Sequence, residues 1–151
     1  MAEVTLRRVG WSLIAVGLID IALLVYSIAN HLAFGSGFGV FAVIAGIFLL
    51  RQSMRTASIV TFISAFFLPP AIAGTVLNPL VGTVPIATEL ILVALIGYTF
   101  WVYRSLTSLV VMEARRSAGV SARTPRLAFI SGITMAVGWA FVVVLALLGT
   151  K

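Results

Sequence analysis

Residues 7–29 read RRVGWSLIAVGLIDIALLVYSIA: two arginines precede an apolar run over 9–29 that one acid, Asp20, interrupts. A helix that crosses the hydrocarbon core of a bilayer needs about 20 apolar residues. The run is continuous rather than alternating, which favours a helix over a barrel strand. It is longer than a signal-peptide core and is not followed by a small-x-small cleavage site, so we expect an uncleaved first transmembrane helix.

The composition of the whole chain agrees with this interpretation. Of the 151 residues, 62% are hydrophobic and 9% are charged, whereas a soluble domain carries about 25% charged residues. The mean hydropathy is +1.21, and the chain contains no cysteine that would form a disulfide framework. The net charge of +6 comes mostly from arginines at the ends of apolar runs. Membrane orientation explains their positions, so we expect no nucleic-acid partner.

Four further apolar runs follow, at 34–50, 56–77, 84–103 and 127–149. Each has roughly the length of one membrane crossing. The sequence therefore predicts an all-α integral membrane protein that forms a single transmembrane domain over 1–151. Its core would be a bundle of five transmembrane helices within the lipid bilayer.

The second run is the shortest, and glycines at its start leave a re-entrant segment as an alternative to a full crossing. The distribution of basic residues decides between the two. If all five runs cross, one side holds nine of the ten basic residues: Arg7, Arg8, Arg51, Arg55, Arg104, Arg115, Arg116, Arg123 and Arg126. This partition predicts five crossings, a cytoplasmic N-terminus and an external C-terminus. We expect the plasma (inner) membrane of a bacterial-type cell.

The fourth helix is expected to extend beyond the membrane. Pro85 suits its first turn, where a missing N–H costs little, and the next strong breaker is Gly119. The pattern therefore predicts one helix over 84–117, about 50 Å long, followed by a loop that ends at Pro125.

Small residues on several helices predict close contacts between helices, because small side chains let helices approach each other in lipid. The longest stripe lies on the fifth helix and repeats every four residues: Ala128, Gly132, Ala136 and Ala140. Shorter patterns occur on the second and third helices. We expect the long stripe to contact another helix, either of this chain or of a second copy, and we expect the protein to be oligomeric.

Pro69 and Pro70 stand in the middle of the third helix. Two successive prolines remove two amide donors, which predicts a kink or a break of the helix. Broken helices form ion and substrate sites in transporters, whereas a static kink would serve only helix packing.

Two acids, Asp20 and Glu89, fall inside apolar runs, where a carboxylate is costly and is often functional. Ser27 and His31 lie seven and eleven residues after Asp20, on the same helix face. This polar line would suit a proton or cation path, with Asp20 and Glu89 as its carboxylates. The alternative is that each acid ties its helix to a neighbour by hydrogen bonds.

The loop arginines Arg115, Arg116, Arg123 and Arg126 are candidates for contact with anionic lipid headgroups, although orientation alone also explains their sign. Neither a phosphate-binding loop, a metal-binding histidine pair nor a nucleophile elbow occurs in the sequence. We therefore expect no metal, no cofactor and no enzymatic activity.

Two functions remain. The first is a helix-packing subunit or accessory protein of a larger membrane assembly, which the small-residue stripes favour. The alternative is a small proton- or cation-linked channel or transporter that uses the two acids and a proline-broken third helix.

Overall fold

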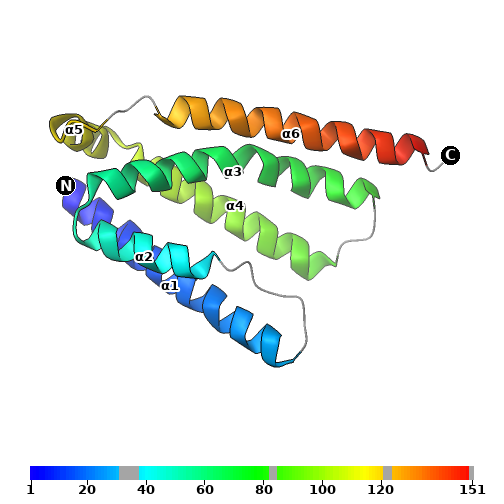
Figure 1. The fold of residues 1–151 in the computed structure, drawn as a ribbon, viewed down its shortest axis with the longest axis horizontal. Coiled ribbons are helices and arrows are strands. Elements are labelled where there is room, and N and C mark those ends of the chain that lie inside the picture. The colour runs from blue at the N-terminus through cyan, green and yellow to red at the C-terminus, as the bar shows by residue number, and fades with distance from the viewer. Residues whose placement is uncertain (31–37, 82–84, 121–123, 150–151) are drawn as a thin grey trace. The chain divides into compact units, whose positions relative to one another are not determined.

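The computed structural model describes residues 1–30, 38–81, 85–120 and 124–149, and these residues form helices and short turns without any strand (Figure 1). The all-α prediction is therefore confirmed for this part of the chain. The helices in order are α1 (Ala2–Ala29), α2 (Gly39–Leu50), α3 (Met54–Val81), α4 (Ile86–Leu106), α5 (Leu109–Ser117) and α6 (Thr124–Gly149).

Four helices are long and apolar enough to cross a membrane, within the described residues. Their apolar parts are Ala2–Ala29, Met54–Leu77, Thr88–Leu106 and Arg126–Leu145. The helix α2 is apolar but has only 12 residues, about 18 Å, compared with a hydrocarbon core of about 30 Å. The apolar helices are consistent with membrane insertion.

The single helix expected over 84–117 is wrong, because the helix ends at Leu106 and α5 starts anew at Leu109. Ser108 has an extended backbone (φ −60°, ψ 147°). The Thr107 hydroxyl donates to the carbonyl oxygen of Tyr103 at 2.8 Å. The N–H of Thr107 donates to the same carbonyl oxygen at 2.9 Å, and the extended backbone at Ser108 then ends the helical run although the apolar pattern continues.

The chain divides into two compact units. Unit 1 contains Met1–Ala57 and Ser108–Val120. It therefore includes α1, α2 and α5 in full, together with the start of α3. Unit 2 contains Ser58–Thr107 and Ser121–Lys151, hence most of α3 together with α4 and α6. Each unit is described separately below, and the single domain stays a prediction.

In unit 1, α1 and α2 form an antiparallel pair that is closed by glycines (Figure 1). A Cβ atom on Gly10 would lie 2.9 Å from the carbonyl oxygen of Gly46, and one on Gly46 would lie 2.6 Å from that of Gly10. Gly17 and Gly39 make the same reciprocal contact at 2.6 and 2.5 Å. Real Cβ atoms do not approach backbone this closely, so only glycine permits this helix separation.

Two tight turns shape the rest of unit 1. After α2, the N–H of Gln52 donates to Leu49 at 2.9 Å and the N–H of Ser53 donates to Phe48 at 3.0 Å. Gln52 has a positive φ of 60°. The end of α5 uses the same pattern, with Gly119 at φ 70°. Both are Schellman-type helix ends, in which a left-handed residue satisfies the last carbonyls.

The short helix α5 packs on α1. Its buried side chains are Val111 and Arg115, and Leu6 and Val9 of α1 are also buried. These four residues belong to the core of unit 1.

The core of unit 2 comes from three helices and contains few large side chains. Its buried side chains include Val60, Thr61, Ser64, Ala65, Leu68, Val102, Leu106, Ala128 and Val143. Most of the large apolar side chains of α4 and α6 are exposed instead. These helices therefore present most of their apolar surface to whatever surrounds the chain.

Candidate functional site

Asp20 is bonded across the α1–α2 pair. The backbone N–H of Gly39 donates to Asp20 Oδ2 at 2.8 Å. Gly39 is the first residue of α2, and the N-cap residue Phe38 makes no side-chain capping bond. The first N–H groups of a helix lack intrahelical acceptors, so Asp20 supplies from α1 the acceptor that a local cap would otherwise provide.

The electrostatics of this contact are favourable, because a helix N-terminus carries a partial positive charge that stabilises a carboxylate. The geometry depends on the neighbouring glycines. A Cβ atom on Gly39 would lie 3.0 Å from Asp20 Oδ2 and 2.5 Å from the carbonyl oxygen of Gly17. Asp20, Gly17 and Gly39 thus form one cluster, which we call the α2 cap. It supports the interpretation of Asp20 as a tie between helices.

The polar line expected beyond Asp20 can be followed only to Ser27. Ser27 is buried, with 2% of its surface exposed. His31 lies outside the described residues.

Glu89 lies in the first turn of α4 and is half-buried. Its N–H donates to the carbonyl oxygen of Pro85, the N-cap residue, at 3.2 Å. A carboxylate in the first turn interacts favourably with the helix dipole, and this position favours a local structural role for Glu89. Asp20 belongs to unit 1 and Glu89 to unit 2, and their use as a pair stays a prediction.

Of the two outcomes predicted for Pro69 and Pro70, the helix break is wrong, because α3 continues through both prolines and also includes Pro79. The kink stays a prediction. A proline fixes φ near the helical value, and each one removes only a single donor. The donors before and after the pair remain. The pair therefore leaves two carbonyl oxygens without their usual donors, those of Ala65 and Phe66, but does not end the helix.

One of these carbonyl groups, that of Phe66, lies against Gly132 of α6. A Cβ atom on Gly132 would overlap with the carbonyl oxygen of Phe66, the residue four positions before Pro70, and would lie 3.1 Å from Pro69 Cδ. The absence of a side chain lets the Cα–H groups of Gly132 face this oxygen, a weak but recurrent contact between helices.

The other members of the predicted stripe lie on the same face of α6. Ala128 is buried, and Ala136 and Ala140 are half-buried. Because Gly132 contacts α3, this face is used within the chain rather than left free for a second copy.

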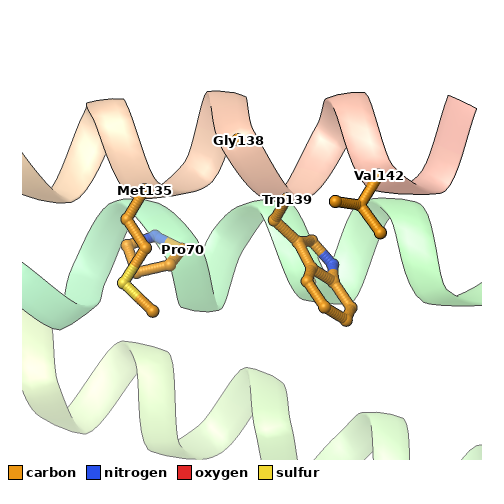
Figure 2. A pocket seen from close by; sticks show the side chains of 6 residues that line it. Pro70, Met135, Gly138, Trp139 and Val142 are labelled. Atoms are coloured by element: carbon orange, nitrogen blue, oxygen red, sulfur yellow. The ribbon is translucent and has the colours of Figure 1, made fainter. Parts of the chain in front are cut away.

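Further along α6, an open apolar groove of about 420 Å³ lies between α3 and α6 (Figure 2). Figure 2 shows the side chains of Met135 and Trp139 extending from α6 past the ribbon of α3. The remaining lining residues are Pro70, Gly74, Gly138 and Val142. A Cβ atom on Gly138 would meet no atom within 4 Å, so this glycine borders empty space, unlike Gly132.

The loop arginines separate into two kinds. Arg115 is completely buried in unit 1, which corrects its assignment to headgroup contact. Its Nη1 lies 3.8 Å from Met112 Sδ, and burial lowers the pKa of Arg115. Arg116 and Arg126 are exposed, and Arg123 lies outside the described residues.

The sequence reasoning missed the reciprocal glycine pairs. It singled out spacings of four, whereas Gly10 and Gly17 on α1, and Gly39 and Gly46 on α2, are each separated by seven. Seven residues are close to two helical turns, so equal spacings on consecutive antiparallel helices were a readable signal.

No group of three or more His, Cys, Asp or Glu side chains that would hold a metal occurs among the described residues. Comparisons with protein-family models, with curated proteins and with solved structures found no match to this chain. The function therefore has to be argued from the contacts above.

Proposed function

We propose that this chain is a small polytopic membrane protein that acts through helix packing, as a subunit or accessory protein of a larger membrane assembly. The observation that carries the proposal is the sparse burial of its membrane-length helices. In the apolar segment of α4 only 11% of the residues are buried, compared with 28% in that of α3. Lipids or the helices of other subunits must cover the remainder.

The candidate chemical groups support the same proposal, because they are engaged in contacts that hold helices. Asp20 bonds to the first N–H of α2, and Gly132 contacts the carbonyl group of Phe66. The rival function, a proton- or cation-linked channel, loses support because α3 is not broken at Pro69 and Pro70.

The proposal includes five membrane crossings with a cytoplasmic N-terminus and an external C-terminus, in a plasma (inner) membrane of bacterial type. The antiparallel glycine contacts support part of this topology. They bring the end of α2, which precedes Arg51, to the end of α1 that carries Arg7 and Arg8. Basic residues on one side are typical of the cytoplasmic face.

Labelling of single introduced cysteines tests the topology directly, because the chain has no cysteine of its own. In intact cells we expect Leu148→Cys to react with an impermeant maleimide and Arg116→Cys to be protected until the cells are opened. The reverse pattern, or equal labelling of both, would contradict the orientation.

Native mass spectrometry of the protein, extracted gently from its own membrane, tests the function. We expect a mass that contains other chains in fixed ratio. A lone chain, or a homo-oligomer without other chains, would contradict the subunit proposal and favour the channel. Crosslinking in the membrane before extraction is the control for dissociation by detergent.

A further inference from the structure

The exposed arginines of unit 1 gather at one end of that unit. Arg7 and Arg8 lie in the second turn of α1. A Cβ atom on Gly10 would lie 3.1 Å from Cδ2 of Leu50, the last residue of α2. Arg51 follows this leucine directly, and Arg55 lies in the first turn of α3, so the antiparallel helix pair brings them to the start of α1.

The helix α5 brings a further arginine to the same end. It packs on α1, where Leu6 and Val9 are buried one or two residues from Arg7 and Arg8, and its own Val111 is buried. Arg115 is buried, whereas the next residue, Arg116, is exposed. Four helices thus contribute to this surface, which we call the basic end: Arg7, Arg8, Arg51, Arg55 and Arg116.

Acidic residues neutralise little of the basic end. Glu3 pairs with Arg7 at 3.1 Å, and both side chains are more than half exposed, so the pair contributes little. Glu113 on α5 is exposed. Among the residues that the structure describes, no carboxylate lies within 4 Å of the guanidinium groups of Arg8, Arg51, Arg55 or Arg116.

We propose that the basic end of unit 1 binds the headgroups of anionic phospholipids. The arginines lie where apolar helices begin or end, which is the level of the headgroups in a membrane. Each basic residue here is Arg rather than Lys. Orientation requires only positive charge, whereas the planar guanidinium also forms paired hydrogen bonds with phosphate oxygens.

The test is a lipid titration of the purified full-length chain in detergent, followed by native mass spectrometry. The probes are phosphatidylglycerol and phosphatidylcholine with identical acyl chains, which differ in headgroup charge. We expect phosphatidylglycerol to bind at least about tenfold more tightly. In the triple variant Arg8→Gln/Arg51→Gln/Arg55→Gln, its affinity should fall by about fivefold for each arginine removed, with phosphatidylcholine unchanged.

A matched control removes charge from unit 2 instead. Arg104 is also exposed, and Arg104→Gln should keep the preference for phosphatidylglycerol. An equal loss per arginine in this control, or no preference in the wild-type chain, would overturn the proposal. Displacement of the lipid by millimolar inorganic phosphate would also overturn it, because the site would then bind free phosphate.

The variant Arg8→Lys/Arg51→Lys/Arg55→Lys keeps the charge and checks that the fold survives, with helicity measured by circular dichroism. We expect it to bind phosphatidylglycerol more weakly than wild type but more tightly than the glutamine variant. Affinity as low as that of the glutamine variant, together with lost helicity in both, would contradict the proposal. Binding is measured on the isolated chain, so its outcome is independent of any larger assembly.

Discussion

Units 1 and 2 both join apolar helices through glycine, but they do so differently. In unit 1, Gly10 faces Gly46 and Gly17 faces Gly39. In each pair, the backbone of one glycine lies where a side chain on the other would have to be. In unit 2, Gly132 faces a carbonyl group, and the neighbouring Gly138 borders a groove. Glycine is therefore required at Gly10, Gly17, Gly39, Gly46 and Gly132, which meet backbone atoms of a neighbouring helix, but not at Gly138, which meets none.

Gly39→Val should have the largest effect on the free energy of unfolding. The new Cβ would meet the carbonyl oxygen of Gly17 at 2.5 Å and Asp20 Oδ2 at 3.0 Å, and rigid backbone cannot yield as a side chain can. We expect a loss of about 3 kcal/mol or more, the upper range for overpacking, in a denaturant titration in detergent micelles. Gly97→Val is the control, because Gly97 has no atom within 4 Å of its Cβ position. Equal losses would show that glycine contact does not hold unit 1.

The two units also differ in the exposure of an arginine side chain. Unit 1 buries Arg115 completely, whereas Arg104 of unit 2 is exposed. Arg115→Ala should lower the free energy of unfolding by about 2 kcal/mol, because the long side chain fills space beneath α5. Arg104→Ala should change it by less than about 0.5 kcal/mol. If the Arg104 variant is the less stable of the two, burial of Arg115 is not important for stability.

Two alanine substitutions on α6 test the difference between Gly132 and Gly138 within unit 2. Gly132→Ala should destabilise the protein by about 1–2 kcal/mol, because its Cβ would overlap with the carbonyl oxygen of Phe66. Gly138→Ala should stabilise it by up to about 1 kcal/mol, since alanine favours helix and the space is open. The same denaturant titration measures both. Changes of the same sign would show that the glycine contact on α6 does not determine stability.

The smallest effect on the free energy of unfolding is expected at the two Schellman-type helix ends of unit 1, those after α2 and α5. Gln52 and Gly119 both have positive φ, but only glycine adopts this conformation without strain. Gln52→Gly should stabilise the protein by about 0.5–1 kcal/mol, and Gly119→Gln should destabilise it by a similar amount. Stabilisation by both substitutions, in the same titration, would contradict this view of the turns.

The helical class could be predicted from the sequence because five long apolar runs leave few alternatives in lipid. The positions of helix ends were harder to predict. The apolar pattern continues past Thr107 and Ser108, yet α4 ends there and the backbone of Ser108 is extended. At Pro69 and Pro70 the predicted break is absent, since two lost donors do not end a helix of 28 residues.

The candidate site was predictable in its residues but not in their partners. Asp20 is conspicuous in an apolar run, yet its partner is a backbone N–H that only the placement of α2 reveals. The burial of Arg115 was unpredictable for a related reason. An arginine at the end of an apolar pattern is expected to be solvated, whereas Arg115 is buried in unit 1, where α5 packs on α1.

The central claim is that Asp20 holds α2 and does not carry ions, and two substitutions test it most directly. Asparagine caps a helix about as well as aspartate, whereas alanine loses about 1–2 kcal/mol. Stability and proton flux into liposomes should be measured for wild type, Asp20→Asn and Asp20→Ala. We predict that Asp20→Asn matches wild type in stability, that Asp20→Ala is less stable, and that no variant conducts protons above protein-free liposomes. Proton flux in wild type that Asp20→Asn abolishes without loss of stability would contradict the account.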